Sequence, residues 1–172
     1  MAAIVRLSFA SGVGPTLADS ISGAKYNLEE SLAGGTTPVA VPTATGTNFS
    51  WHKVFRYEVT TIDAATSIGN FRHRISAAPA TGLKLWFRDD GATYTRATAV
   101  AATSSGTNDS APAGFTAAPT TDTVYDAASY SAGTTGGKGD YLSYALGVSA
   151  LYVGGAGSAT ALPNLISTFD EV

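Results

Sequence analysis

The sequence predicts an all-β fold, an antiparallel β-sandwich of about eight or nine strands with extended loops or arms. Three observations support this prediction. Ala, Gly, Ser and Thr make up 89 of the 172 residues and only 13% are charged, so the Glu, Lys, Arg and Leu spacing of a long-helix bundle is absent. Short runs alternate apolar with polar residues, which is the period of a half-buried strand. Stretches rich in glycine and proline separate these runs.

The strongest strand patterns lie at the N-terminus and in the middle of the chain. Alternating apolar and polar residues predict strands over residues 4–9, 54–62 and 68–75. In the last of these, Phe71 and His73 share one face and the arginines occupy the other. We therefore expect a strand with one buried and one solvent-facing side.

Residues 83–97 predict a β-hairpin. An alternating run ends at Asp89-Asp90-Gly91, whose residues tolerate positive φ, and the strand pattern resumes at Thr93-Tyr94-Thr95. A calcium loop is the other interpretation of these aspartates. The regular acidic spacing and terminal glutamate of that motif are absent, so a turn is preferred.

The remaining strands are read from weaker patterns. Residues 141–148 alternate with little charge on either face, which predicts a strand deep in a sheet. Residues 151–153 and 164–169 complete the pattern. Residues 25–32 are interpreted as a strand rather than a helical turn. The stretch 39–41, flanked by prolines, fits an edge strand or an extended connection.

The length fits one domain, residues 1–172, with extended segments at 10–50 and 97–139. The second segment is rich in Ala, Thr, Ser and Gly, a composition that predicts flexibility. Two islands within it, 111–115 and 124–126, contain aromatic residues and depart from that composition.

Charge and cysteine content exclude several classes. The net charge is −3, so no basic surface exists to neutralise a run of phosphates, and nucleic acid is not expected as a partner. With no cysteine there is neither a disulfide framework nor a thiolate metal site. No apolar run is long enough to span a membrane, and the N-terminus does not resemble a secretory signal. We expect a soluble, unexported protein.

No catalytic, cofactor-binding or metal-binding set is evident, so we expect a protein that is not an enzyme and needs no cofactor. His52 and His73 have no other ligand at a recognised metal spacing and are interpreted as one loop and one strand histidine. Glu29 and Glu30 are adjacent, which places them on opposite faces of a strand, and we interpret them as solvated charges. Nucleophile elbows and phosphate-binding loops are absent.

Binding to other proteins is a better explanation of the composition. Lys and Glu are scarce, as they are where proteins pack together. Seven of the ten basic residues fall within 51–96, where they would form a mildly basic face, either a docking surface for an acidic protein or the ordinary polar side of a sandwich. The candidate interface residues are Trp51, Arg72, Arg74, Trp86, Phe115 and Tyr125.

Several stretches carry a family resemblance: Tyr26–Leu32, Thr36–Pro42, Gly46–Trp51, Ala80–Trp86 and Ala161–Asn164. In these stretches the chain resembles the small β-rich virion proteins of tailed bacteriophages that decorate or cement heads or attach at the neck and tail. The resemblance brings no catalytic or ligand residue. It implies a structural role, with a folded sandwich and extended arms that add strands to neighbouring subunits.

The expected function is therefore that of a capsid decoration or cement protein that binds the virion lattice. A neck or tail component is the first alternative. A carbohydrate-binding or adhesion module is the second, with stacking surfaces at Trp51, Trp86, Tyr94 and Tyr141. The expected partners are the major capsid protein or neighbouring tail and neck subunits, together with further copies of the chain. Its expected location is the virion, after a soluble stage in the host cytoplasm.

Overall fold

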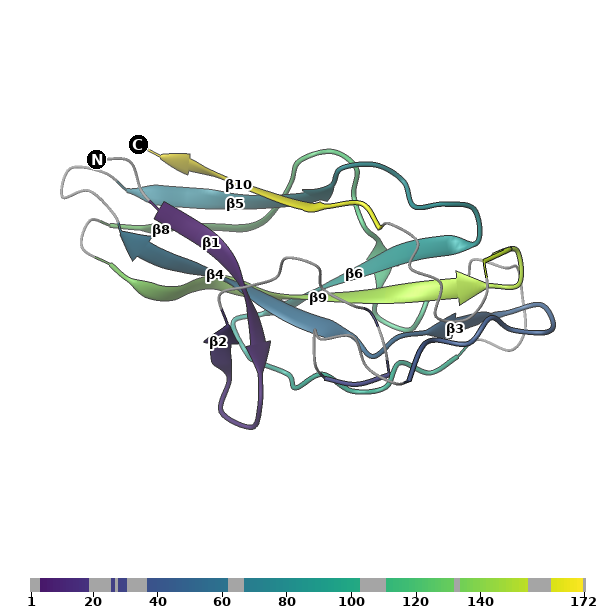
Figure 1. Ribbon diagram of the computed structural model, residues 1–172. Coiled ribbons are helices and arrows are strands. Elements are labelled where there is room, and N and C mark those ends of the chain that lie inside the picture. Colours follow the sequence, from purple (N-terminus) through teal and green to yellow (C-terminus); the bar gives the residue numbers. More distant parts are fainter. Residues whose placement is uncertain are drawn as a thin grey trace.

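In the part of the chain that the structure describes, ten strands, all antiparallel to their neighbours, form two sheets that pack against each other (Figure 1). The computed structural model describes residues 4–18, 26, 28–30, 37–61, 67–102, 111–131, 134–154 and 162–171. Within these ranges the secondary structure is strand and loop, without a helix. The prediction of an all-β, sandwich-like fold is confirmed.

The larger sheet has seven strands. Six of them follow the order β2-β1-β4-β9-β6-β7, and β3 also pairs with β9. Their bounds are β1 Ile4–Ser11, β2 Thr16–Ala18, β3 Thr47–Phe49, β4 Lys53–Thr61, β6 Leu83–Gly91, β7 Thr116–Ala117 and β9 Gly136–Ser149. The 14-residue strand β9 is the spine of this sheet, because β3, β4 and β6 all pair with it.

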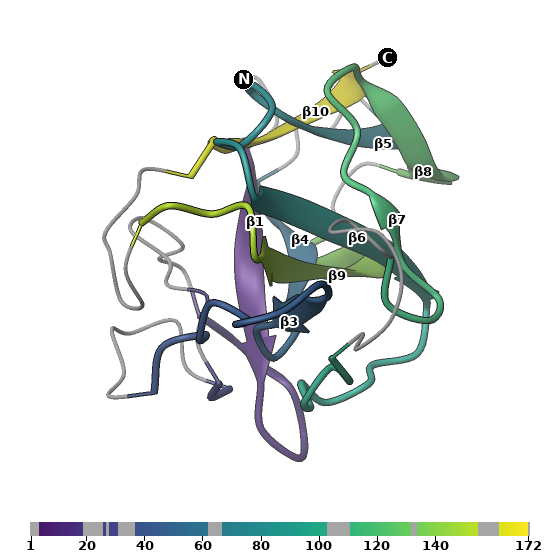
Figure 2. The same cartoon turned by 90° about the vertical axis from the view of Figure 1, so that its right-hand side faces the viewer.

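The smaller sheet has three strands in the order β10-β5-β8. Their bounds are β5 Ile68–Ile75, β8 Thr123–Tyr130 and β10 Leu165–Glu171. Figure 2 shows this sheet stacked on the larger one, with β5 in the middle and β10 and β8 at its opposite margins. The strands expected over 4–9, 54–62, 68–75 and 164–169 are therefore present, with ends shifted by one or two residues.

Aromatic rings fill the space between the two sheets. Phe71 of β5 is fully buried and contacts Tyr57 of β4, with ring centroids 4.9 Å apart. Tyr57 stacks on Tyr125 of β8 at 5.7 Å, and Phe55 meets Tyr144 edge-on at 6.0 Å. Alternation in β4, β5 and β9 turns these rings toward one another, and their burial is the main force that joins the sheets.

The outer face of the larger sheet is covered by irregular segments. Ala10 and Val54 pack with Ala97 and Tyr141, while Phe49 and Trp86 pack with Phe115 and Ala145. Residues 141–149 of β9 are consequently buried on both faces, which confirms the strand deep in a sheet that low charge predicted.

The hairpin expected at 83–97 is wrong. Strand β6 runs through Asp89-Asp90-Gly91 and continues to pair with β9, while residues 92–100 form no strand. Gly91 does adopt positive φ, +66°, but it uses this freedom for a register shift opposite Tyr141 rather than a reversal. The residues that suit a turn also suit a bulge, and pairing with β9 decided between them.

The segment 97–139 is also more regular than its composition predicts. Its described part contains β7, all of β8 and the first residues of β9. Both aromatic islands are packed: Phe115 is buried, and Tyr125 lies within β8. Small residues hide the strand period here, because alternation between Ala, Ser and Thr leaves little contrast in hydrophobicity.

Three weaker strand predictions fare differently. Of residues 25–32, the structure describes 26 and 28–30, and these are not in a strand. Residues 39–41 form an extended connection, one of the two alternatives expected. Residues 151–153 form a turn and loop after β9, not a strand.

Candidate interaction surface

Five of the described strands pair on one side only, namely β2, β3, β7, β8 and β10, and they differ in how well each could accept a further strand. The larger sheet ends at β2 and β7, which have three and two residues. The smaller sheet ends at β8 and β10, which have eight and seven. Short edges offer few unpaired backbone groups. In the larger sheet, β2 covers only residues 9–11 of β1 and β7 only residues 86–87 of β6, so short stretches of these two strands are also open among the described residues. The longest edge strands belong to the smaller sheet.

Two irregularities interrupt β8. Its register against β5 shifts on either side of Phe71, because β8 carries an extra residue at each place. At the second shift the Asp126 Oδ1 atom accepts a hydrogen bond from the backbone N–H of Ala128 at 2.7 Å. Bulges and self-satisfied N–H groups are devices that protect a sheet edge from unwanted pairing.

Strand β10 is regular where β8 is not. Leu165 to Thr168 pair residue by residue with Ile75 to Arg72 of β5. The later register shift places its extra residue on β5, where Asn70 has a φ of +49°. The outer edge of β10 forms no strand pairing with any residue that the structure describes.

Side chains alternate cleanly along β10. Leu165 and Phe169 pack into the core between the sheets, and Ser167 between them hydrogen-bonds to Tyr57. Ile166 and Thr168 lie opposite Arg74 and Arg72 and share the outer side of the sheet with these arginines, where both are partly buried.

Asp170 anchors the end of β10 to β5. Its carboxylate accepts two hydrogen bonds from Arg72, at 2.6 and 2.7 Å, and a third from Asn70 Nδ2 at 2.8 Å. These contacts, the Arg72 bond foremost, lower the pKa of Asp170 to about 2. The carboxylate is therefore ionised across the physiological pH range, and the end of β10 stays attached to β5.

A buried histidine lies beneath the smaller sheet. His73 is 2% exposed; its Nδ1 atom hydrogen-bonds to the Tyr144 hydroxyl and its ring lies 3.9 Å from that of Phe87. Its Nε2 atom is buried without a hydrogen-bond partner. Burial lowers the pKa of His73 to about 4, so the ring is neutral at physiological pH and serves as a core group. The strand position expected for His73 is confirmed.

A second polar centre, the Glu30 clamp, lies on the opposite side of the larger sheet. Glu30 accepts hydrogen bonds from the Gly12 N–H at 2.9 Å, from Arg96 Nε at 2.8 Å and from the Tyr94 hydroxyl at 3.4 Å. Burial alone would raise the pKa of Glu30, but the bonds from Arg96 and Gly12 outweigh it and lower the pKa. Three separate segments thus meet at one carboxylate.

Lys53 holds the neighbouring residue of the same segment. It is fully buried and donates a hydrogen bond to the Glu29 carbonyl. Burial lowers the pKa of Lys53 to about 8 although Glu29 and Glu30 act against this. The interpretation of Glu29 and Glu30 as solvated charges is therefore wrong for Glu30, whose side chain is only 16% exposed. The hydrogen-bond donors to Glu30 lie far away in the sequence, so the adjacent pair of carboxylates could not predict them.

The six candidate interface residues do not form one surface. Trp86 and Phe115 are 4% and 7% exposed and belong to the core on the outer face of the larger sheet. Tyr125 is half-buried against Tyr57, and Trp51 is half-buried just before β4. Only Arg72 and Arg74 lie together, on the solvent-facing side of β5. Trp86 and Phe115 must be removed from an exposed docking face, because the covering loops bury them.

The cations of the expected basic face are engaged within the chain. All nine Lys and Arg residues that the structure describes have a carboxylate, a carbonyl or an aromatic ring of this chain as a partner. The pairs are Arg6–Glu58, Lys53–Glu29, Arg56–Gly139, Arg72–Asp170, Arg74–Asp122, Lys84–Trp86, Arg88–Asp90, Arg96–Glu30 and Lys138–Tyr130. A docking surface for an acidic protein is therefore not supported.

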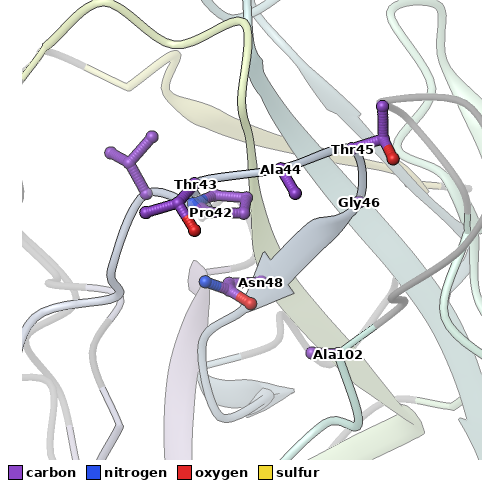
Figure 3. Close-up of a pocket in the computed structure, with 8 residues that line it drawn as sticks. Pro42, Thr43, Ala44, Thr45, Gly46, Asn48 and Ala102 are labelled. Carbon is purple, nitrogen blue, oxygen red and sulfur yellow. The ribbon is translucent and has the colours of Figure 1, made fainter.

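A shallow hollow of about 390 Å³ lies beside β3 (Figure 3). It is lined by Val41, Pro42, Thr43, Ala44, Thr45, Gly46, Asn48 and Ala102, none of which is charged. The Asn48 amide donates to the Ala40 carbonyl at 2.8 Å, which holds this lining residue to the segment before Val41. Such a lining offers hydrogen bonds and small apolar contacts but no acid, base or metal ligand.

Comparison with known proteins gives no relative. Neither a family model, nor a curated protein, nor a solved structure matches the chain. Among the described residues, His, Asp and Glu nowhere gather in a group of three or more that could hold a metal ion. In the same part of the chain no helix is long and apolar enough to cross a membrane.

Sequence reasoning found β10 but missed its edge. The alternation of Leu165, Ser167 and Phe169 predicted the strand, yet alternation says nothing about which strands lie on either side. The absence of lysine and proline inside 165–171 was the one available signal, since protected edges often carry these residues.

Proposed function

We propose that this chain is a structural protein that works by binding other protein chains, and that it belongs to the virion of a tailed bacteriophage as a head decoration or cement protein. Its partners are the major capsid protein or neighbouring subunits and further copies of itself. A neck or tail component is the alternative within the same class.

The observation that carries the proposal is the open β10 edge on a framework whose charges are paired internally. A strand edge recognises another backbone through main-chain hydrogen bonds and needs no ionic partner. Five of the described arginines form ion pairs with carboxylates of the same chain, which weakens the field that these charges would offer to an anionic ligand. This combination supports assembly into a fixed lattice rather than capture of a small ligand.

The carbohydrate-binding alternative loses support from burial. Of the four side chains expected to stack on sugars, Trp86 and Tyr141 are 4% and 6% exposed and cannot reach a ligand without opening the fold. We therefore do not propose it.

The test is physical association with particles. Virus particles from a culture that produces this chain are separated on a density gradient, and the molar ratio of the chain to the major capsid protein is measured by mass spectrometry. We expect the chain to band with the particles at a fixed ratio. Many copies per particle would indicate the head, and a few copies the neck or tail. A chain found only in the soluble fraction would contradict the proposal.

A high-salt wash sharpens this test. Because the described ion pairs lie within the chain, contacts to the lattice should be mainly backbone and apolar. The distance over which exposed charges interact is about 8 Å at physiological ionic strength and becomes shorter as salt is added. High salt therefore weakens ionic contacts but affects backbone and apolar contacts little. We expect the ratio to survive the wash.

A further inference from the structure

The β10 edge can pair with an identical copy of itself. Among the described edges, β2, β3 and β7 are short and β8 is interrupted by two bulges. Residues 4–8 of β1 and the parts of β6 outside its β7 pairing are also open, but β10, with seven residues and no extra residue of its own, is the longest uninterrupted edge among them. A two-fold axis perpendicular to the sheet would bring two β10 strands together antiparallel, and each strand would then supply the edge that the other lacks.

We propose that the chain forms a two-fold dimer in which β10 pairs with β10 of a second copy, with Ser167 on the axis. This inference rests on the proposed function, that the chain works by binding protein chains, and it names the first partner as a second copy. The two smaller sheets would merge into one continuous sheet of six strands, β8-β5-β10 followed by the partner's strands in reverse order.

The side chains of β10 support this register. Around Ser167, Leu165 would lie opposite the partner's Phe169, and Ile166 opposite the partner's Thr168. Leu165 and Phe169 both face the core, and Ile166 and Thr168 both lie partly exposed on the opposite side of the strand, so each pair would meet on one side of the sheet. The Leu165–Phe169 pair would join two apolar side chains, and the Ile166–Thr168 pair two β-branched side chains, which suit the pleated surface of a sheet.

The charges of β10 also tolerate this register. Asn164 would lie opposite the partner's Asp170, which places an amide donor beside a carboxylate. The two Asp170 residues would be six residues apart along the ladder, or about 20 Å, which exceeds the screening length at physiological salt. Shifting the axis by one residue to Thr168 would oppose Ile166 with the partner's Asp170, so the Ser167 register is preferred.

Charge repulsion gives the first test. In the variant Ile166→Lys/Thr168→Lys, each lysine would lie opposite a lysine of the partner. The matched control, Val124→Lys/Ala128→Lys, adds the same charge at the exposed surface of β8 on the other margin of the same sheet. Sedimentation equilibrium should find a dimer for the unchanged chain and the control, and a monomer for the β10 variant. Circular dichroism and thermal melting verify that each variant is folded.

Disulfide cross-linking gives the second test, and it adds no charge at the edge. The chain has no cysteine, so Ser167→Cys introduces a single thiol. Directly opposed residues of an antiparallel ladder have Cα atoms about 4.5–5.5 Å apart, within the range of a disulfide. We expect mild oxidation to convert most of this variant to a covalent dimer, while Ala92→Cys, in the exposed turn after β6, remains monomeric.

Two results would overturn the inference: an unchanged chain that is monomeric from micromolar to millimolar concentration, or a Ser167→Cys variant that cross-links no faster than Ala92→Cys. A monomer that still bands with particles would contradict the dimer and leave the proposed function standing. A β10 dimer that is absent from particles would contradict the proposed function and leave the dimer standing.

Discussion

The two faces of the larger sheet are covered in different ways. Its inner face packs on the smaller sheet through a continuous set of aromatic rings, with Tyr57, Phe71 and Tyr144 nearly or fully buried. Its outer face is covered by loops that bury two smaller clusters and are held by the Glu30 clamp. Burial therefore dominates on one side, and polar contacts between distant segments contribute more on the other.

This difference indicates which parts of the fold can open locally. Strands that exchange ladder hydrogen bonds and bury rings open only with the whole domain, whereas loops held by a few polar contacts can open locally at lower cost. We expect the inner face to determine global stability and the outer face to determine local opening.

The largest effect is expected from emptying the inner core. Phe71→Ala removes a fully buried ring that contacts Tyr57, Tyr130 and Phe169, and should lower the free energy of unfolding by about 3–5 kcal/mol. Phe115→Ala, on the outer face, is the matched control and should cost less because its loop can collapse into the space. Urea unfolding measures both, and equal losses would contradict the distinction between the faces.

Acid should weaken the inner face through His73. The folded state keeps the pKa of His73 at about 4, below the ordinary value of 6.5, so the unfolded chain binds the proton first as the pH falls. Stability from this group is complete above pH 6.5 and declines until about pH 4, by at most about 3 kcal/mol. Unfolding free energies across this pH range measure the decline. His73→Phe should reduce the slope, and an unchanged slope would contradict the assignment.

Removing the clamp charge should open the outer face. Glu30→Gln leaves Arg96 and the Gly12 N–H without an anionic acceptor and should cost about 1–2 kcal/mol. Amide hydrogen exchange should accelerate at Gly12 and in residues 92–98 while β5 stays protected. Uniform acceleration across both sheets would mean that the clamp is part of the global core.

The smallest effect is expected at an exposed pair. Asp122→Asn removes the partner of Arg74 on the solvent-facing side of the smaller sheet, where both side chains are at least one-third exposed. The loss should stay below about 1 kcal/mol, because exposed ion pairs contribute little. A chemical denaturation curve that separates clearly from the unchanged chain would show that this surface is more constrained than its exposure indicates.

The central strands were predictable from local pattern, and the connections were not. Phe55, Tyr57 and Phe71 alternate with charged residues, so the buried face of β4 and β5 follows from side-chain order alone. The aspartates and glycine at 89–91 permit both a turn and a bulge, and the choice depended on β9, some fifty residues away. In the same way Glu30 looked solvated because its donors, Gly12 and Arg96, are remote in sequence.

The interface candidates also divide into residues placed by local pattern and residues placed by distant contacts. Arg72 and Arg74 were placed correctly on an outward face because the strand period determines it, whereas Trp86 and Phe115 were expected outside and lie in the core. Their burial comes from loops that fold back over the larger sheet, and loops carry no period.

Composition and alternation determined that this chain is all-β, where its most strongly alternating strands lie and which side of each is apolar, because these properties depend on neighbours one or two residues away. Only the tertiary structure decided the order of strands within the sheets, the identity of the open β10 edge and the partners of Glu30 and His73. Pairing is a contact between distant segments, so its outcome depends on competition among all strands and has no local signature.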